Sequence, residues 1–476
     1  MPDSPGGIRL YYKNVTADIL GPEHGLTAEE LDGLTSRVGE IVRAVEAERA
    51  HGAHRYRDLP YDCDMLDTLE EHRERYSGTC ETLVVCGIGG SALGNIALQT
   101  ALNPFTYNLL PPETRGGPQL FVMDNIDPMQ FGSLLDQLAG RLDSTLFNVI
   151  SKSGETAETA AQFLIVRDLL RERLGSDGPK RHIVVTTDKI KGTMRKIVKA
   201  EGYDSLPVPD EVGGRFSVLS AVGLFSAGMC GIDTARLLAG ACAMDERVRV
   251  PELRANPAAL IAGIHYLMCQ RGKRLHAMMP YSHHLEDLAD WYRQLWAESL
   301  GKQKSLEGED VFVGPTPIKA LGATDQHSQV QLYREGPNDK VFTLLAVEAF
   351  DREMPMPVAD GPVEAMAYLG GHDMGTLLNN ERLATEQSLV DSRRPTLTVR
   401  FPRITPETVG QFVYMYEAAT TIAAKLFNIN PYDQPAVELG KEYTFALMGR
   451  TGYEHIAEQL KGKLDDDPAY LVPPRP

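Results

Sequence analysis

Short apolar runs alternate with longer amphipathic stretches from about residue 80 onwards. The runs lack the alternation of polar and apolar residues that marks a strand with one exposed face. Strands of this kind are typical of parallel sheets that helices cover on both faces. The first series comprises Thr82–Cys86, Leu120–Asp124, Leu146–Ile150 and Ile183–Thr186.

A second series of the same kind follows residue 255. Its expected strands are His276–Pro280, Asp310–Val313, Val341–Val347 and Thr396–Phe401, and its expected helices lie at about 256–271, 285–299, 372–390 and 406–427. The pattern predicts an α/β fold with two doubly wound sandwich domains, mainly parallel sheets, and helical segments at both ends. The expected boundaries are 1–75 for a helical N-terminal segment, 76–245 and 246–440 for the two domains, and 441–476 for a C-terminal helix and tail.

Two of the expected helices begin with recognisable local signals. Thr27 and Glu30 have the spacing of a capping box, in which each side chain bonds to the other residue's backbone N–H. Asp127 followed by Pro128 places a capping residue before a proline at the first helical position. Both signals predict where a helix starts.

Composition and charge narrow the classes of partner. The 476 residues carry a formal net charge of −17, which argues against generic binding to nucleic acids or anionic membranes. A local basic pocket for an anionic substrate is still compatible with that charge. No apolar run is long enough to span a bilayer, and Met1–Pro5 lacks the features of a secretory signal. We therefore expect a cytoplasmic protein with no nucleic-acid or membrane partner.

Cysteine and histidine spacing argues against a bound metal. None of the six cysteines stands in a C-x-x-C pair, and Cys86 and Cys269 lie in apolar surroundings typical of reduced core residues. The 12 histidines form no H-x-x-x-H pair or similar set. The sequence gives no reason to expect a metal or a redox cofactor.

The first expected strand runs directly into the glycine-rich segment Gly87–Gly94. Glycines at this point let the backbone approach a ligand, and the following helix offers free N–H groups to an anion. Gly87, Gly89 and Ala92 also fit a dinucleotide fingerprint, which needs an acid about 20 residues further on. The next expected strand ends only at Asp124. Anion binding is the favoured interpretation, with a dinucleotide site and a ligand-free tight turn as alternatives.

The third expected strand runs into a segment rich in hydroxyl groups, Ser151–Thr159. Neutral donors, backbone amides and one point charge at the start of a helix are what a phosphate site needs. The alternative is a helix cap that happens to be rich in serine and threonine. The candidate phosphate-binding side chains are Ser151, Lys152, Ser153, Thr156 and Thr159.

The two loops together resemble the sugar isomerase domain, which holds phosphosugars. Four further segments resemble those of the glucose-6-phosphate isomerase family and follow the family's order along the chain. They are Gly213–Ser217 around the arginine, Ala297–Lys302 around the catalytic glutamate, Asp325–Ser328 around the histidine, and the C-terminal signature Asp433–Lys441. The resemblance implies two sugar isomerase domains, in agreement with the two series of strands.

The residues themselves agree with this resemblance. Glu298 lies at the edge of an apolar helical stripe, where desolvation would raise the pKa of a carboxylate that acts as a general base. Arg215 lies in a turn flanked by glycine, from which a guanidinium can reach a ligand. Without the resemblance, Glu298 would be interpreted as a solvated helix residue and His327 as a structural or exposed histidine. The stripe consists of Leu285, Leu288, Tyr292, Leu295 and Trp296.

The resemblance also implies a mechanism without a cofactor. A proton moves between C2 and C1 of an open-chain hexose phosphate, with Glu298 as the base and Arg215 beside the developing oxyanion. His327 and Lys441 assist ring opening, and in the family the histidine comes from the neighbouring subunit of a homodimer. The expected substrate-binding residues are Gly89, Gly90, Ser91, Ser151, Lys152, Ser153, Thr156 and Gln434.

Two departures from the family pattern bear on these assignments. Glu155 and Ala157 stand in the phosphate loop where hydroxyl residues are common in the family, and we expect Glu155 to point to solvent. Pro435 replaces an aromatic or small residue beside Gln434. Two other functions remain open: an isomerase that also accepts mannose-6-phosphate, and a non-catalytic phosphosugar-binding regulator.

Overall fold

A computed structural model describes residues 6–472, apart from the side chain of Pro362. Residues 1–5, where no secretory signal is expected, and the last four residues of the expected tail lie outside this range. The chain divides into two compact units, one that ends at Pro431 and one that begins at Tyr432. Each unit is described by itself below.

The first sheet has five parallel strands in the order β3-β2-β4-β5-β6. All four strands expected in this region are present, with ends that differ by no more than two residues. The fifth, β6, was missed because it is an edge strand with a polar start and a proline, Pro207, which only an edge tolerates. The bounds are β2 Thr82–Cys86, β3 Gln119–Met123, β4 Thr145–Ile150, β5 Ile183–Asp188 and β6 Asp204–Val208.

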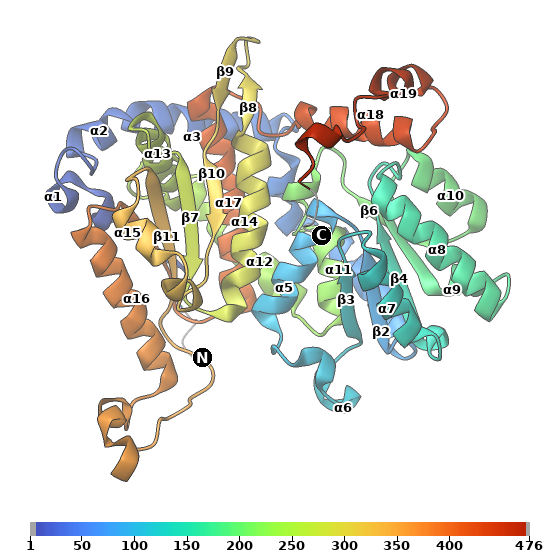
Figure 1. The fold of residues 1–476 in the computed structure, drawn as a ribbon, viewed down its shortest axis with the longest axis horizontal. Helices are drawn as coiled ribbons and strands as arrows, with labels where there is room; N and C mark the ends of the chain where they lie inside the picture. Colours follow the sequence, from blue (N-terminus) through green and yellow to red (C-terminus); the bar gives the residue numbers. More distant parts are fainter. Residues whose placement is uncertain (1–5, 473–476) are drawn as a thin grey trace. The chain divides into compact units, whose positions relative to one another are not determined.

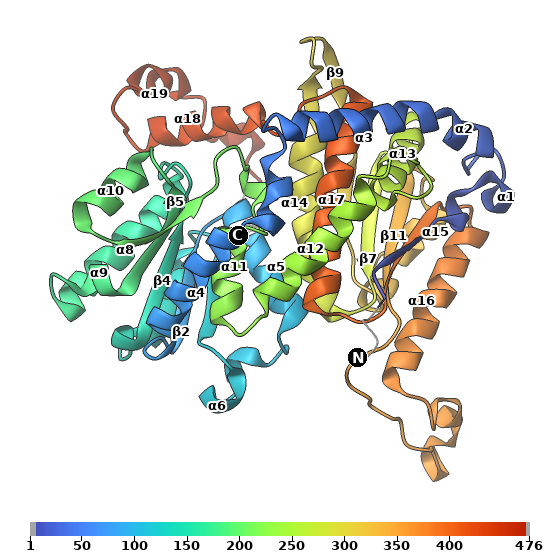
Figure 2. The same ribbon diagram turned by 180° about the vertical axis from the view of Figure 1, so that it is seen from behind.

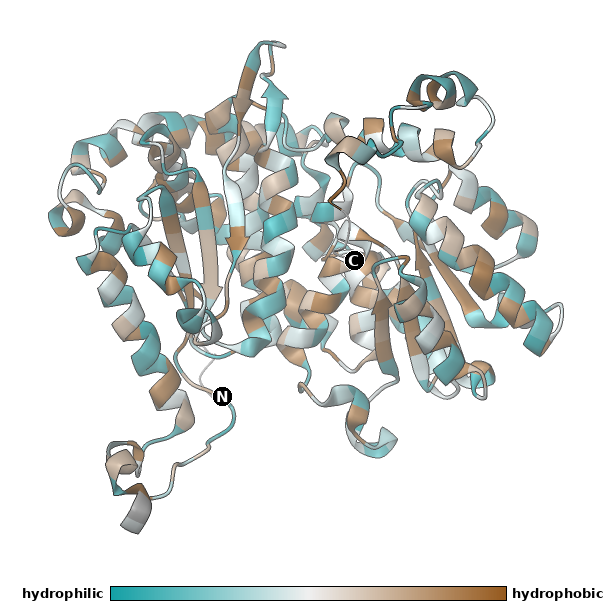
Figure 3. Ribbon diagram, viewed as in Figure 1, coloured by the Kyte–Doolittle hydropathy of each residue, from teal (hydrophilic) through white to brown (hydrophobic). Residues whose placement is uncertain are grey.

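Helices cover both faces of this sheet (Figure 1). On one face, α7, α8 and α10 bury side chains such as Phe131, Phe163 and Met194 against Val84, Phe147 and other strand residues. On the other, α4, α5 and α11 pack against one another (Figure 2). Figure 3 shows the outcome, largely apolar strands between helices that carry both hydrophilic and hydrophobic residues. The bounds are α4 Cys63–Ser77, α5 Leu93–Leu102, α7 Pro128–Leu138, α8 Ala157–Leu174, α10 Thr193–Glu201 and α11 Ala221–Met229.

The second sheet has the order β1-β12-β11-β7-β10, with β1 antiparallel and the other strands parallel. Helices α15 and α16 cover one face, and α13, α14 and α17 lie on the other. The predicted fold class is confirmed, although the N-terminal segment contributes a strand as well as helices. The bounds are β1 Arg9–Tyr11, β7 Leu275–Pro280, β10 Thr316–Lys319, β11 Lys340–Val347, β12 Thr396–Phe401, α13 Pro257–Gln270, α14 Glu286–Leu300, α15 Val330–Glu335, α16 Met374–Asp391 and α17 Pro406–Phe427.

One expected strand does not belong to this sheet. Asp310–Val313 is β9, which pairs antiparallel with β8 (Lys302–Lys304) in a separate two-stranded hairpin. Its side chains alternate in exposure, and Phe312 is 72% exposed. The strand at the sheet edge is instead β10, whose four residues include Pro317 and are too few and too polar for the pattern to reveal.

The predicted helix starts are confirmed at atomic detail. Thr27 Oγ1 accepts from the N–H of Glu30 at 3.2 Å, and Glu30 Oε2 accepts from the N–H of Thr27 at 2.8 Å, so the capping box is complete. Asp127 accepts from the N–H of Met129 at 2.8 Å at the start of α7. The four helices expected after residue 255 begin and end within two residues of their predicted bounds.

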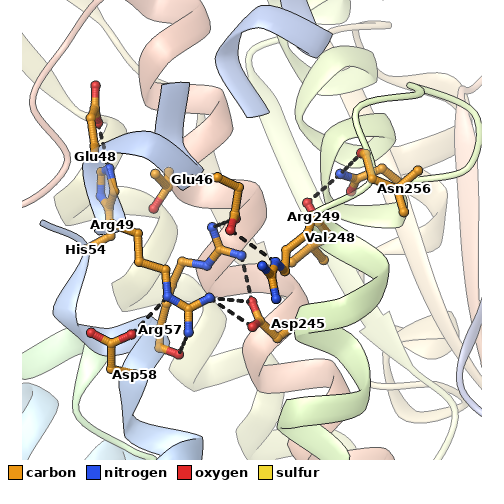
Figure 4. Close-up of polar contacts among 12 residues, drawn as sticks. Glu46, Glu48, Arg49, His54, Arg57, Asp58, Asp245, Val248, Arg249 and Asn256 are labelled. Carbon is orange, nitrogen blue, oxygen red and sulfur yellow. Dashed lines mark hydrogen bonds and ion pairs between the residues drawn. The ribbon is translucent and has the colours of Figure 1, made fainter. Parts of the chain in front are cut away.

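A buried charge cluster ties the N-terminal helices to the centre of the first unit (Figure 4). Asp245 on α12 (Thr234–Val248) is fully buried and accepts from Arg49 at 2.9 Å and from Arg57 at 2.6 Å. The hydroxyls of Tyr61 and Tyr414 donate to the same carboxylate at 2.8 and 2.5 Å. Three of these four donors come from the segment 49–61, and the fourth comes from α17. The Asp245 carboxylate on α12 therefore connects that segment to both helices.

Candidate active site

The glycine loop lies directly against the arginine loop. It follows β2, passes through the 3₁₀ turn Gly89–Ser91 and leads into α5. A Cβ on Gly90 would stand 2.2 Å from the carbonyl carbon of Gly214, so only glycine permits this approach. Gly89 adopts a φ of +56°, which also favours glycine. The glycines therefore allow the two loops to meet, in addition to any ligand they contact.

Arg215 is a fixed cation at this meeting point. It lies in the 3₁₀ turn Gly214–Phe216 and is 3% exposed. Its guanidinium donates from Nε to Ser299 Oγ at 2.7 Å, from Nη1 to Glu298 Oε2 at 3.0 Å, and from Nη2 to the carbonyl of Pro431. These three hydrogen bonds point in different directions and fix the orientation of the guanidinium. A cation that is already in position can stabilise negative charge that develops in a transition state.

Glu298 lies near the end of α14 and forms an ion pair with Arg215. Its side chain is 35% exposed, so the carboxylate is both anchored and open to a ligand. Lys302, just beyond the helix, donates to the Glu298 carbonyl at 2.8 Å and holds the last turn. The structure thus brings together two of the predicted catalytic residues, which are 83 positions apart in the chain.

Gln294 joins this pair and was missed from the sequence. Its Nε2 donates to Glu298 Oε1 at 3.2 Å and stands 3.0 Å from the position of a Cβ on Gly89. Its Oε1 is buried and accepts no hydrogen bond from the residues that the structure describes. Only the position of Gln294 could have indicated this contact. It stands four residues before Glu298, and residues with this spacing lie on the same face of a helix.

Two hydroxyl groups of the phosphate loop form hydrogen bonds with the backbone of the same loop. Ser151 Oγ accepts from the N–H of Gly154 at 3.0 Å, and Ser153 Oγ accepts from the N–H of Glu155 at 3.1 Å. Thr156 precedes α8 without forming a capping hydrogen bond through its side chain. Glu155 is exposed, as expected. The loop is therefore held in shape by the residues that are predicted to bind phosphate.

Lys152 has a partly structural role in this arrangement. Its ammonium group donates to the carbonyl of Val212 at 3.1 Å and to that of Pro209 at 3.4 Å. These carbonyls belong to the loop that connects β6 to the arginine turn. Lys152 therefore links the phosphate loop to the arginine loop, and its contact with phosphate stays a prediction.

His327 lies in a well-defined loop and is exposed. It ends the 3₁₀ turn Thr324–His327, in which Asp325 accepts from the N–H of Leu321 at 2.7 Å and Gln326 accepts from Tyr281 at 2.7 Å. The imidazole forms no hydrogen bond or ion pair with any residue between 6 and 472. The structure does not join His327 to the Arg215–Glu298 pair.

Gln434 and Lys441 belong to the C-terminal unit. Gln434 precedes the 3₁₀ turn Pro435–Val437 and is exposed. Lys441 lies on α18 (Glu438–Leu447), where its ammonium pairs with Glu438 at 2.7 Å. Both polar groups are accessible within their own unit, and their roles at the site stay predictions.

No group of three or more histidine, cysteine, aspartate or glutamate side chains within residues 6–472 is arranged to hold a metal ion. Over the same range, every helix is too short or too polar to cross a membrane.

Comparison with known proteins identifies the family. A family model described as phosphoglucose isomerase matches residues 68–458. The chain belongs to this family. It is 42% identical to a glucose-6-phosphate isomerase of Carboxydothermus hydrogenoformans over 98% of this chain and 99% of that protein. It is 43% identical to a glucose-6-phosphate isomerase of Rubrobacter xylanophilus over 92% of this chain and 98% of that one.

Solved structures share the fold. A hypothetical protein of Thermus thermophilus is similar with a TM-score of 0.83 and 34% identity, covering 93% of this chain and 100% of the other. A glucose-6-phosphate isomerase of Chlamydia trachomatis is similar with a TM-score of 0.79 at 22% identity, covering 97% and 93% of the two chains. The second likeness supports the fold alone.

Proposed function

We infer that this protein interconverts glucose-6-phosphate and fructose-6-phosphate through an enediolate intermediate, as a step of glycolysis and gluconeogenesis. The observation that carries this inference is the anchored Arg215–Glu298 pair beside the glycine loop, in a chain of the phosphoglucose isomerase family. A non-catalytic phosphosugar-binding protein has no need for such a pair.

The geometry supports a division of labour between the two residues. The C–H next to a sugar carbonyl is a weak acid, so the reaction needs both a base and a stabilised enediolate oxygen. We assign Glu298 as the base that moves the proton between C2 and C1, because its carboxylate is accessible and held by two donors. Arg215 supplies the positive charge for the oxyanion, because its position does not depend on the substrate.

The remaining roles are assigned by family. His327 and Lys441 open the cyclic sugar, and Gln434 hydrogen-bonds near the reacting atoms. The glycine and phosphate loops hold the phosphate at a distance from the bond changes, which supplies binding energy and orientation. The binding residues in this assignment are Gly89, Gly90, Ser91, Ser151, Lys152, Ser153 and Thr156.

The direct test is a coupled assay that converts fructose-6-phosphate to glucose-6-phosphate. The protein is first dialysed against a chelator, and neither metal nor NAD is added to the isomerisation step. We expect full activity. Activity that returns only with a divalent ion would contradict the mechanism, and the same assay with mannose-6-phosphate defines the range of substrates.

The phosphate loop gives a prediction for binding. Replacing Ser153 and Thr156 with alanine should weaken binding of 6-phosphogluconate, a stable anionic analogue, by at least about tenfold. Each hydrogen bond to a charged group contributes about 1.5–3 kcal/mol, and about 1.4 kcal/mol corresponds to a factor of ten. The measurement is isothermal calorimetry.

The matched control for the phosphate loop is Ser133→Ala with Ser176→Ala, two exposed serines of the same unit outside the loop. This variant should bind 6-phosphogluconate like the wild type. An unchanged affinity in the Ser153 and Thr156 variant would place the phosphate elsewhere.

We also propose that the protein is a homodimer in which His327 completes the neighbouring subunit's site. The exposed imidazole, without a bonded partner among the described residues of its own chain, supports this proposal. Six free cysteines, of which Cys80, Cys86 and Cys230 are buried, support a location in the reducing cytoplasm.

Complementation tests the shared site. Glu298→Gln and His327→Ala dimers should each be nearly inactive, and after subunit exchange each hybrid dimer should hold one intact site. Random exchange makes about half of the dimers hybrid, so about a quarter of wild-type activity should return. Two differently tagged Glu298→Gln preparations serve as the control. No recovery despite demonstrated exchange would mean that His327 acts in its own chain.

A further inference from the structure

A strongly basic segment follows β5, in contrast to the net charge of −17 of the whole chain. It runs from Lys189 to Lys199 and is here named the basic segment. Its cationic residues are Lys189, Lys191, Arg195, Lys196 and Lys199, and it contains no acidic residue. Because a phosphorylated sugar is an anion, the net charge of −17 opposes its approach, and the location of the basic segment is therefore informative.

The basic segment adjoins the phosphate loop. The N–H of Asp188, the last residue of β5, donates to the carbonyl of Lys152 at 3.2 Å, and the N–H of Thr193 donates to the carbonyl of Ser153 at 3.0 Å. A Cβ on Gly154 would stand 2.3 Å from the backbone nitrogen of Met194, so α10 begins in direct contact with the phosphate loop. The two segments therefore form one edge of the site.

The lysines of the basic segment carry charge that is not neutralised by ion pairs. Lys189, Lys191, Lys196 and Lys199 are exposed, and none forms an ion pair with a residue that the structure describes.

The nearby acids are only partly neutralised, because Asp210 and Glu211 of the 209–212 loop are exposed and form no ion pair with a residue that the structure describes. The Asp188 carboxylate is buried and accepts from the N–H groups of Lys191 and Ile190, which lower its pKa. Glu201 pairs with Arg167 and Arg171, and Glu155 accepts from Thr193 at 3.4 Å. Counted with Lys152, the six cations outnumber the four remaining acids, which are Glu155, Asp188, Asp210 and Glu211, so this edge keeps a modest net positive charge.

Lys152, the lysine of the phosphate loop, is not the only source of positive charge at this edge of the site. Lys152 donates to two backbone carbonyls of the 209–212 loop, so its ammonium group is already engaged on that side. Lys189 and Lys191 follow the neighbouring strand end and stand in solvent. Their charges are therefore open to solvent beside the phosphate loop.

We propose that the basic segment is an electrostatic guide that speeds the capture of the substrate's phosphate group without contacting the bound sugar. This proposal rests on the proposed function. Clefts lined by one sign of charge raise association rates by about 10–10³-fold, and the effect falls with ionic strength. The guide opposes the repulsion that the acidic remainder of the protein exerts on an anion.

The test is Lys189→Glu with Lys191→Glu, followed by stopped-flow association of 6-phosphogluconate. At an ionic strength of about 0.01 M, where screening extends over about 30 Å, the rate should fall about tenfold. At about 1 M, where screening extends over about 3 Å, it should lie within about twofold of the wild type. The value of kcat at saturating substrate should not change, and the variant with glutamine at both positions should show a smaller loss with the same salt dependence.

The matched control is Lys180→Glu with Arg181→Glu, two exposed cations just before the other end of β5. It changes the net charge by the same amount, so a large loss there would show that total charge, and not the basic segment, sets the rate. An unchanged rate in the Lys189 and Lys191 variant would overturn the proposal, and a loss that persists at high salt would replace it with direct contact. If the wild type neither binds 6-phosphogluconate nor turns over fructose-6-phosphate, the proposed function itself fails.

Discussion

Replacing Glu298 with glutamine is expected to lower kcat by about 10²–10⁴-fold, the usual contribution of a positioned general base. Glutamine keeps the size of the side chain and its reach to Arg215 but removes the basic oxygen. Arg215 should stay in place because it also donates to Ser299 and to the carbonyl of Pro431. The coupled assay measures kcat, and calorimetry with 6-phosphogluconate should show an affinity within about threefold of the wild type.

A matched control lies on the same helix. Glu286 begins α14, far from the Arg215 contact, and pairs with His283 at 2.9 Å and Lys319 at 3.0 Å. Glu286→Gln should change kcat by less than about twofold, because Glu286 lies at the opposite end of α14 from Glu298 and its ion pairs are with His283 and Lys319. A folded Glu298→Gln enzyme with near wild-type kcat would mean that another residue is the base.

Replacing Asp245 with asparagine should lower the free energy of unfolding by about 3–5 kcal/mol, the effect of removing one partner from a buried ion pair. The change leaves Arg49 and Arg57, which are largely buried, without their shared carboxylate. Urea unfolding followed by the fluorescence of Trp291 and Trp296, both buried in the same unit, measures the loss.

The pH dependence gives a second readout for Asp245. Burial acts to raise the pKa of this carboxyl, but the hydrogen bond from Arg49 and the charge of Arg57 outweigh burial and lower the pKa to about 2. A lowered pKa stabilises the fold above the ordinary value of about 4, and this contribution is lost as pH falls toward 2. The difference between wild type and Asp245→Asn should therefore shrink over that range.

The control for the Asp245 prediction is an exposed ion pair. Asp351 is 70% exposed where it pairs with Arg403 at 2.6 Å, and Asp351→Asn should lower the free energy of unfolding by less than about 1 kcal/mol. Equal losses in the two variants would contradict the role assigned to the buried cluster.

The central strands were predictable because burial on both faces leaves a clear pattern. Every residue of β2, β4, β5 and β11 is buried, and each strand was expected within two residues of its bounds. Strands β6 and β10 were missed because edge positions admit proline and polar residues. The sequence predicts β9 as a strand of the second sheet, but it belongs to the hairpin. The composition of four residues indicates a strand without indicating which strand it pairs with.

The site was predictable as a set of segments but not as an arrangement. Family resemblance indicated Arg215 and Glu298, but only the fold places them 3.0 Å apart. Gln294 carries no motif of its own, and the orientation of Lys152 toward the 209–212 loop depends on contacts far along the chain. Local sequence patterns do not encode such long-range contacts, which is why these two findings required the structure.

The most direct test of the central claim follows the substrate's C2 proton in deuterium oxide by proton magnetic resonance. If Glu298 forms an enediolate, the wild type should replace the C2 hydrogen of glucose-6-phosphate with deuterium while it interconverts the two sugars. Glu298→Gln should lose exchange and isomerisation in parallel, by about 10²–10⁴-fold. Exchange at a near wild-type rate in a folded Glu298→Gln enzyme would contradict the account.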